Sequence, residues 1–525
     1  MGRAALAAAL LAIASLVAVD VSAAWLVDAI RDGNRTTALA LLDDGADPNA
    51  ASDDGTTALH WAVANGDAEL VARLVAAGAD PNVANVYGAT PMAEAAVSAG
   101  TEIIEALLEA GADPDAESED GQTSLMLVAR TANVGAARLL LEHGANVNAR
   151  ERLFGQTALM WAASQRRPQM VALLLEHGAE VDARSRIHDW ERQVSGEPRA
   201  QYRPSGGLTP MLFAVREGCL DCVRLLLDAG ADIDLPDPDG ITPLIMAVAN
   251  MRFDIAAFLL DAGADPNRWD WWGRTPLYLA VDLNTLPHGG RPDRPVLDAT
   301  TSLELIERLL AAGANPNAQL KLRPPFRNVG ADRGVDHMLI IGTTPLLRAA
   351  KAFDTDAIEL LLAHGADPNL GQVIGITPVM AAAGLGSRDA DTRGVFTTPD
   401  VQQRAIAALE LLLDAGGDIN ATIEGRYGEY CCPYPSDESL DHMKGQAPIH
   451  GAAFWGWNDV VTYLVERGAD LDVRDARGMS PEDAALGRAG GNSRGDRIDV
   501  HEDTAELIRR LSAERTGAPA AARRP

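Results

Sequence analysis

The motif GADPN occurs at residues 45–49, 78–82, 263–267 and 365–369 of this 525-residue chain. Between successive copies, five of the ten intervals are 33 or 34 residues and the other five are 50 to 52 residues. The variants are GADPD (111), GANVN (144), GAEVD (178), GADID (230), GANPN (313), GGDIN (416) and GADLD (468). A period of this length indicates a repeat architecture, although length alone would suggest about three or four separate domains.

A second motif follows each copy and is represented by GITPLIMA at residues 240–247. A threonine followed by proline caps a helix and occupies its first turn, where the missing proline N–H costs nothing. A second helix carries leucines in one apolar stripe, as in VRLLLDAG at 223–230, and ends at a glycine suited to a left-handed cap. Two such helices cannot bury their apolar faces alone, so neighbouring units are expected to stack.

These paired motifs resemble those of the ankyrin-repeat family, whose unit of about 33 residues combines a turn with two helices. The resemblance covers residues 25–511. It implies an all-α ankyrin-repeat solenoid of about twelve helix-turn-helix units with β-hairpin fingers. It also implies that each long turn, or finger, projects beside a concave groove lined by the first helices.

The N-terminus has the three parts of a secretory signal. Arg3 and the free amine precede a nearly apolar stretch at 4–19, and small residues follow it. We expect cleavage after Ala23 or Ala24, although an uncleaved anchor is the alternative. The expected organisation is a signal peptide (1–23), bare ankyrin repeats (24–186), repeats with long insertions (187–512) and a disordered tail (513–525).

The long intervals contain the insertions. Three of the insertions lengthen fingers, and two separate the two helices of one repeat. The last repeat also has an insertion between its two helices. Because loops carry function more often than scaffolds do, the insertions are candidates for binding, with neutral insertion as the alternative. The segments are 183–206, 318–341, 421–444, 282–302, 384–403 and 487–503.

The formal net charge of −29 argues against nucleic-acid binding, which needs a clustered positive field. No apolar run of membrane-spanning length follows the N-terminal segment. The mature chain is therefore expected to be a soluble monomer in the periplasm or outside the cell, with no membrane contact.

Motifs for catalysis and for cofactors are lacking. GNSRG at 491–495 matches G-x-S-x-G but has no preceding strand. His60 and His450 occupy a repeated position of the second motif, and the insertion histidines His188, His337 and His442 match no metal-binding spacing. We therefore expect no enzyme activity, no cofactor and no metal.

Four cysteines form two local pairs, Cys219 with Cys222 and Cys431 with Cys432. Five repeats separate the pairs, so a disulfide is expected only within a pair. Cys222 occupies a position that is Val or Ile in other repeats, and a small core residue is the alternative.

The finger NRWDWWGRTPL at 267–277 carries three tryptophans where other repeats have small or polar residues. Trp, Tyr and Arg dominate binding hot spots, so this finger is predicted to bind a partner. The alternative is that the finger at 318–341, with Pro324, Pro325 and Phe326, folds over these rings as a lid. The predicted partner-binding residues are Arg268, Trp269, Trp271, Trp272, Arg274 and Tyr278.

These observations predict an exported, non-enzymatic scaffold or adaptor that holds a protein partner through its groove and fingers. One alternative is a secreted effector that acts on a host protein. Another is a metal or redox protein that uses the insertion loops, which requires His, Cys and carboxylates to meet in space.

Overall fold

In a computed structural model, the chain folds into two compact units. Unit 1 comprises Met1–His188 with Ser205–Asp232, and unit 2 comprises Asp189–Pro204 with Ile233–Pro525. The structure describes residues 25–98, 100–188, 191–192, 201–202, 205–285, 298–322, 340–386, 398–425, 443–488 and 500–516. The predicted signal peptide, Cys431, Cys432 and Pro324–Phe326 lie outside these residues.

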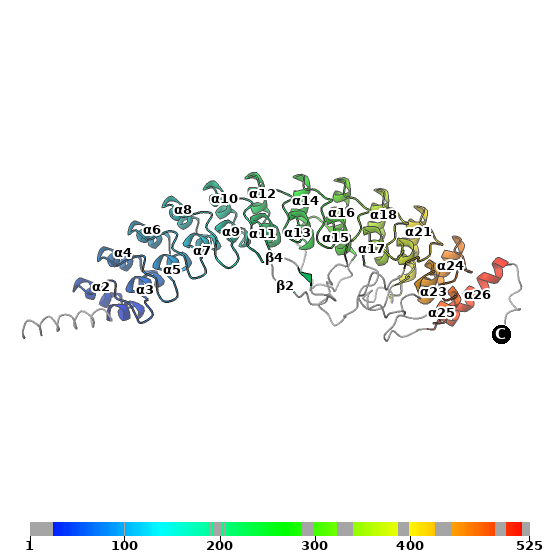
Figure 1. Ribbon diagram of the computed structural model, residues 1–525, viewed down its shortest axis with the longest axis horizontal. Helices are drawn as coiled ribbons and strands as arrows, with labels where there is room; N and C mark the ends of the chain where they lie inside the picture. The colour runs from blue at the N-terminus through cyan, green and yellow to red at the C-terminus, as the bar shows by residue number, and fades with distance from the viewer. Residues whose placement is uncertain are drawn as a thin grey trace, which may run out of the picture. The chain divides into compact units, whose positions relative to one another are not determined.

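Unit 1 consists of helix pairs stacked in two layers (Figure 1). A short helix at residues 25–31 pairs with α2, and each later pair joins a first helix to a second helix. The helices are α2 (Arg35–Asp43), α3 (Ala58–Ala64), α4 (Ala68–Ala76), α5 (Pro91–Ser98), α6 (Thr101–Glu109), α7 (Ser124–Arg130), α8 (Val134–Glu142), α9 (Ala158–Ser164), α10 (Pro168–Glu176), α11 (Pro210–Glu217) and α12 (Leu220–Asp228).

Unit 2 repeats the same arrangement, with α13, α15, α17, α19, α23 and α25 as the first helices. The helices are α13 (Pro243–Ala249), α14 (Phe253–Asp261), α15 (Pro276–Asn284), α16 (Ser302–Ala311), α17 (Pro345–Ala352), α18 (Thr355–Ala363), α19 (Pro378–Ala382), α21 (Val401–Asp414), α23 (Pro448–Phe454), α24 (Asn458–Glu466), α25 (Pro481–Ala485) and α26 (Glu502–Thr516). The described residues of the two units contain twelve such pairs.

The C-terminal helix continues into the segment that was predicted to be a disordered tail. Helix α26 runs to Thr516, and residues 517–525 lie outside the described part of the chain. Arg515 donates a hydrogen bond to the Ala469 carbonyl over 2.7 Å, which attaches the last helical turn to the preceding repeat. The predicted tail is therefore wrong for residues 513–516.

The first helices begin as the second motif predicts. The Thr242 hydroxyl accepts the Ile245 N–H over 3.3 Å, and Pro243 occupies the first turn of α13. The second helices end at glycines with a left-handed backbone, such as Gly230 at φ +90°. Between them, apolar side chains such as Leu226 and Leu244 are fully buried.

Fingers are mostly turns, so the expectation of β-hairpin fingers holds for a minority of them. Within the described residues, paired strands occur as β1 (Ile187–His188) with β4 (Ser205–Gly206) in unit 1, and β2 (Glu191–Arg192) with β3 (Gln201–Tyr202) in unit 2. Elsewhere in the described chain, finger residues form isolated bridges, as between Ala51 and Thr57, or turns. Side-chain hydrogen bonds replace the strand ladder there, as Asn85 accepts the N–H groups of Tyr87 and Ala89.

The last residue of each GADPN-type motif joins successive repeats. Asn49 donates from Nδ2 to the Gly78 carbonyl over 3.0 Å and accepts the Asp80 N–H at Oδ1 over 2.7 Å. A carboxylate at this position can only accept, as Asp182 does from the Asp232 N–H over 3.2 Å. The asparagines that make both bonds are Asn49, Asn82, Asn148, Asn267, Asn317, Asn369 and Asn420.

This difference predicts opposite effects for two matched substitutions in unit 1. Asn148→Asp removes the Nδ2 bond to the Gly178 carbonyl, and Asp182→Asn supplies a donor for the equivalent Gly230 carbonyl. Each change is expected to alter the free energy of unfolding by about 1 kcal/mol, downward for Asn148→Asp and upward for Asp182→Asn. Urea denaturation measures both, and a change of the same sign in the two variants would contradict the role of the Asn donor.

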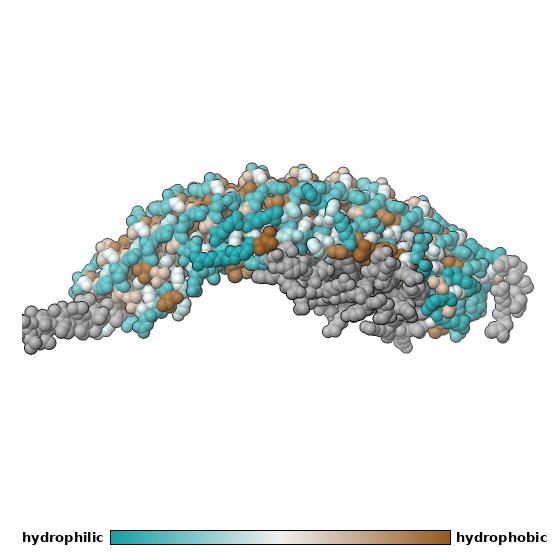
Figure 2. Space-filling view, viewed as in Figure 1, coloured by the Kyte–Doolittle hydropathy of each residue, from teal (hydrophilic) through white to brown (hydrophobic). Residues whose placement is uncertain are grey.

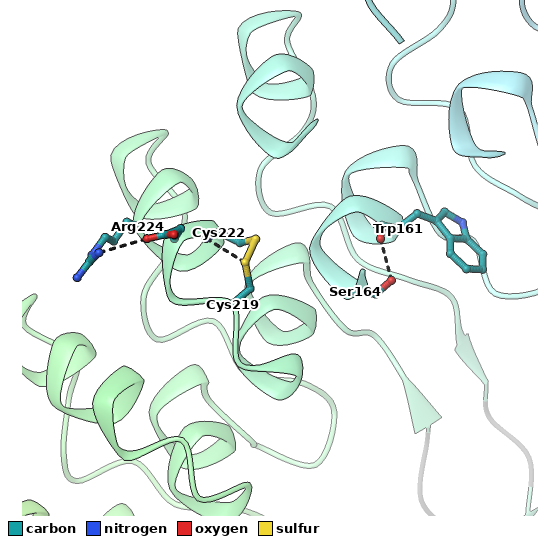
Figure 3. Close-up of a disulfide and its surroundings, with 6 residues drawn as sticks. Trp161, Ser164, Cys219, Cys222 and Arg224 are labelled. Carbon is teal, nitrogen blue, oxygen red and sulfur yellow. Dashed lines mark hydrogen bonds and ion pairs between the residues drawn. A yellow bond between two sulfur atoms is a disulfide. The ribbon is translucent and has the colours of Figure 1, made fainter. Parts of the chain in front are cut away.

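The structure places a disulfide between Cys219 and Cys222, at the start of α12 (Figure 3). The two Cα atoms are 5.2 Å apart, and the Cys219 Sγ accepts the Cys222 N–H over 3.3 Å. Cys219 thus caps α12 where Asp67 caps α4, and Cys222 fills a core position. Both cysteines are buried, and the disulfide links the N-cap residue of α12 to a residue in the first turn of that helix.

Among the described residues, no helix is long and apolar enough to cross a bilayer.

Candidate partner-binding surface

The finger at 267–275 is organised by one buried carboxylate, Asp270. Its Oδ1 accepts the N–H groups of Trp272 and Arg274 over 3.1 and 2.9 Å, and its Oδ2 pairs with the Arg274 guanidinium at 2.7 Å. Burial raises the pKa of Asp270, and the charge of Arg274 opposes this rise. The same turn occurs around Asp237 and Asp475, so Asp270 belongs to the fold of the finger.

Exposure alternates along this turn. Trp269 and Trp271 are 52% and 42% exposed. Asp270, which lies between them, and Trp272, which follows them, are buried. The alternation arises in a turn, in which the Gly273 N–H donates to the Asp270 carbonyl over 2.8 Å. The prediction of three exposed tryptophans is therefore correct for Trp269 and Trp271 and wrong for Trp272.

Trp272 belongs to the packed interior of the finger. The Arg274 guanidinium lies 4.6 Å from the Trp272 ring centroid. The Trp272 carbonyl accepts the N–H groups of Lys321 and Leu322 over 2.9 and 3.1 Å. Arg274 thus forms an ion pair with Asp270 and a cation–π contact with Trp272, so it is not available as the predicted partner contact.

Tyr278 is also buried, at 2% exposure. It lies three residues after Thr275, the position that His60 holds relative to Thr57. That position faces inward in both helices, which is why Tyr278 does not line a binding surface. The prediction that Tyr278 contacts a partner is wrong for this reason.

The exposed part of the finger consists of Arg268, Trp269 and Trp271. The Arg268 side chain is 57% exposed and pairs with Asp265 at 3.4 Å. The Trp271 N–H donates to the Asp239 carbonyl of the preceding finger over 2.7 Å, which fixes the backbone beneath the ring. We call Trp269 and Trp271 the tryptophan pair.

Part of the following finger lies against this pair. Lys321 Nζ lies 3.5 Å from the centroid of the Trp269 ring, a cation–π contact. Gly273 allows the two fingers to approach each other, because a Cβ there would lie only 2.5 Å from the backbone nitrogen of Lys321. The predicted lid is thus present as a contact by residues 321–322, while Pro324, Pro325 and Phe326 lie outside the described residues. Trp269 and Trp271 remain exposed beside it.

The neighbouring finger carries a carboxylate with a strongly raised pKa. Burial raises the pKa of Asp237 from 3.8 to about 6, and the nearby Asp239 and Asp270 carboxylates add to the rise. Its Oδ1 accepts the N–H groups of Asp239 and Ile241, both over 2.9 Å. Asn85 makes the equivalent two bonds with an uncharged side chain in unit 1.

Asp237→Asn is therefore expected to stabilise unit 2 at pH 7.5. Ionised Asp237 costs the folded state up to about 3 kcal/mol relative to the unfolded state, given pKa values of about 6 and 3.8. This cost is absent below pH 3.8, grows between pH 3.8 and about 6, and is constant above. Thermal unfolding at pH 7.5 and at pH 3.5 measures the difference. An Asn variant that is less stable than the native chain at pH 7.5 would contradict the assignment.

The first helices of unit 1 present a partly open face. It consists of residues four and seven positions after the threonines that precede α3, α5, α7 and α9, and these positions lie on one side of a helix. Trp61, Leu127 and Trp161 are half-buried, Val97 is 64% exposed, and Arg130 is exposed. We call these residues the open face of unit 1.

Several equivalent positions in unit 2 are buried. Met246 and Leu279 are at most 8% exposed, and Arg348 and Lys351 are 7% and 4% exposed. Arg348 Nε pairs with Asp282 Oδ1 at 2.7 Å. The two units thus differ at the face that their first helices present, a difference that sequence reasoning missed because it treated the first repeats as bare.

An aromatic cluster in unit 2 was also missed. Trp455 and Trp457 stack with ring centroids 6.0 Å apart, and Phe353 meets Trp457 edge-on at 6.1 Å. The Trp455 Nε1 donates to the Gly384 carbonyl over 3.0 Å, at the end of the short helix α19. A Cβ on Gly384 would meet Trp455 at 2.7 Å, so the cluster and the glycine fit each other. The cluster is a packing feature where the insertion begins.

His60 and His450, which occupy the same repeat position, have a structural role in this chain. His60 Nδ1 accepts the Thr57 N–H over 3.1 Å, and Nε2 lies 3.0 Å from the Ala89 carbonyl. His450 makes the same two contacts with Ala447 and Met479, and burial lowers the pKa of both histidines. Among the described residues, no group of three or more His, Cys, Asp or Glu side chains could hold a metal ion.

Comparison with known proteins identifies the family. Residues 26–118, 96–185, 194–270 and 211–288 match the family described as ankyrin repeats (3 copies), and residues 341–371 and 444–476 match the single ankyrin repeat. With its twelve stacked helix pairs, the chain belongs to the ankyrin-repeat family.

A solved structure with similarity to the chain is the ankyrin repeat domain of Bcl-3, described as a unique member of the IkappaB protein family. The identity is 28%, the TM-score is 0.37, and the match covers 43% of this chain and 95% of that domain. Ankyrin repeats generally mediate protein–protein interaction.

Proposed function

We propose that this protein is an exported, non-enzymatic scaffold that holds a protein partner through the tryptophan pair. The observation that carries the proposal is the exposure of Trp269 and Trp271 on a finger whose backbone is fixed from both sides. The Asp239 carbonyl and the N–H groups of Lys321 and Leu322 supply that fixation.

Two exposed indoles are costly for an unbound protein surface. Large aromatics gain most of their free energy when they leave water, and a rigid finger loses little conformational entropy on binding. Trp is also the residue type most enriched at binding hot spots. The fold does not need these two rings, because Asp270 and Trp272 already organise the turn.

The hydrogen bonding of the histidines supports a non-enzymatic function. Both ring nitrogens of His60 and of His450 contact backbone groups, so neither ring has a free nitrogen for proton transfer. Cys219 and Cys222 are buried and disulfide-bonded, which removes them from exchange with thiols in solution.

Export is supported by the tripartite N-terminal sequence and by the Cys219–Cys222 bond, which suits an oxidising compartment. The mature chain is proposed to act as a periplasmic or secreted monomer. N-terminal sequencing of protein from the producing cell should begin at Ala24 or Trp25. Recovery of mature protein with Met1 intact would overturn export with cleavage.

Partner capture tests the binding surface. Crosslinking in the native compartment should recover a partner with the native chain and lose it with the Trp269→Ser, Trp271→Ser double variant. Tyr87→Ser is a control, because Tyr87 is an aromatic residue that is 69% exposed and lies far along the sequence in unit 1. Equal capture by the double variant and the control would overturn the proposed surface.

A further inference from the structure

Four arginines in unit 1 have exposed side chains that form no ion pair with any described residue; Arg138 lies on the second helix α8, and the other three lie outside the second helices. Arg130 ends α7, Arg166 follows α9 and Arg186 lies on the finger that contains β1. Several other arginines of the unit form ion pairs, as Arg152 does with Glu117 at 2.7 Å. Arg130, Arg166 and Arg186 lie on neighbouring repeats of a chain with a net charge of −29, and they are positive groups without an acidic partner among the described residues.

Arg130 is held in place by an aromatic ring. Its guanidinium carbon lies 4.8 Å from the Trp161 ring centroid, and the helices α7 and α9 that carry the two residues pack together. Stacking on a ring leaves the N–H groups at the edge of the guanidinium available for an acceptor. The Trp161 indole points away from the disulfide region (Figure 3). This pair is therefore a positioned donor for an anionic group.

Apolar side chains are exposed at two adjacent fingers of the same unit. Leu153 and Phe154 are 56% and 46% exposed, and Ile187 is 49% exposed. The Arg186 N–H donates to the Phe154 carbonyl over 2.6 Å, so these fingers lie side by side. Hydrophilic residues cover much of the visible surface, with hydrophobic residues scattered among them (Figure 2).

We propose that unit 1 binds an extended, acidic peptide segment of a protein, whose carboxylates meet Arg130 and Arg166 and whose apolar side chains meet the fingers. This site is separate from the tryptophan pair and does not depend on it. At about 0.15 M salt, charges more than about 8 Å away are largely screened, so distant carboxylates of the chain act only weakly on a peptide bound at these arginines.

The local charges favour a peptide over a nucleic acid. Glu119 and Asp120 are exposed on the finger that precedes Leu153. A nucleic acid carries a negative charge at every nucleotide and would meet these carboxylates, whereas a peptide can present carboxylates only where the arginines lie. Guanidinium groups also bind carboxylates through paired hydrogen bonds.

Fluorescence anisotropy with the full-length protein tests the proposal. The probes are a labelled, unstructured peptide rich in Glu and Leu and its counterpart with Gln in place of Glu. At about 0.15 M salt, the Glu peptide is expected to bind at least about tenfold more tightly. Arg130→Ala with Arg166→Ala should abolish that preference, whereas Arg138→Ala, at an exposed position of α8, should leave it unchanged.

Four results would overturn the proposal, and the first three concern the peptides, the arginines and a nucleic-acid competitor. One is equal affinity for the two peptides, and another is unchanged preference in the Arg130 and Arg166 variant. The third is competition by single-stranded oligothymidine at the same concentration as unlabelled Glu peptide. Loss of the preference in the Trp269→Ser, Trp271→Ser variant would place the peptide on the tryptophan pair and likewise overturn a site in unit 1.

Discussion

Leu226→Asp is expected to unfold the last repeat of unit 1. Leu226 is fully buried in α12, between α11 and the preceding second helix α10. Deleting its side chain alone costs about 2–5 kcal/mol, and an unpaired buried carboxylate adds a further penalty. Because stacked repeats depend on their neighbours, the loss should extend to the adjacent repeat. Circular dichroism during urea denaturation measures it.

Arg224→Asp is the matched control for this variant. It introduces the same residue two positions earlier on α12, where the side chain is 52% exposed. The ion pair with Asp221 that it removes is a surface contact worth about 1 kcal/mol at most. Comparable destabilisation by the two variants would contradict the stacked core inferred around α12.

Trp272→Ser is expected to destabilise unit 2 by about 3–5 kcal/mol. The ring is buried beneath the Arg274 guanidinium, so its removal leaves a cavity and exposes the Asp270–Arg274 pair to water. Differential scanning calorimetry should show a lower melting temperature for the part of the chain that contains this finger.

The Trp269→Ser, Trp271→Ser double variant provides the contrast, because it removes more aromatic surface from the same finger. Both rings are exposed, so the melting temperature should change by less than a quarter of the Trp272→Ser effect. If the double variant melts as low as Trp272→Ser, the tryptophan pair belongs to the core and the binding surface is refuted.

The architecture could be predicted well from the sequence because the residues that begin and end the helices recur in each repeat. The Thr-Pro start, the apolar stripe and the terminal glycine are local features, and the structure shows them as helix caps and left-handed turns. The joining role of the motif asparagine was not predicted, since its partner lies in the next repeat, as Gly78 does for Asn49.

The candidate site was predicted less well, for reasons that particular residues explain. Tyr278 shares its position with His60, and aligning the repeats would have placed it inside. To predict that Trp272 is buried, one must know that the Asp270 side chain is directed inward. The equivalent hydrogen bonds of Asp237 in the preceding finger could have suggested this. The approach of Lys321 to Trp269 joins residues of different repeats and could not be predicted from periodicity.

The burial of ionised groups in unit 2 was equally unpredictable. Arg348 and Asp282 lie on first helices of different repeats, at positions that are open in unit 1. Repeat periodicity assigns the same environment to both units, and only the folded chain distinguishes them.

Isothermal titration calorimetry with the recovered partner tests the central claim most directly. The Trp269→Ser, Trp271→Ser variant should bind at least about thirtyfold more weakly than the native chain, the loss typical of a hot spot worth about 2 kcal/mol. Its melting temperature should stay close to that of the native chain. An affinity within about threefold of the native value, with the fold intact, would contradict the account.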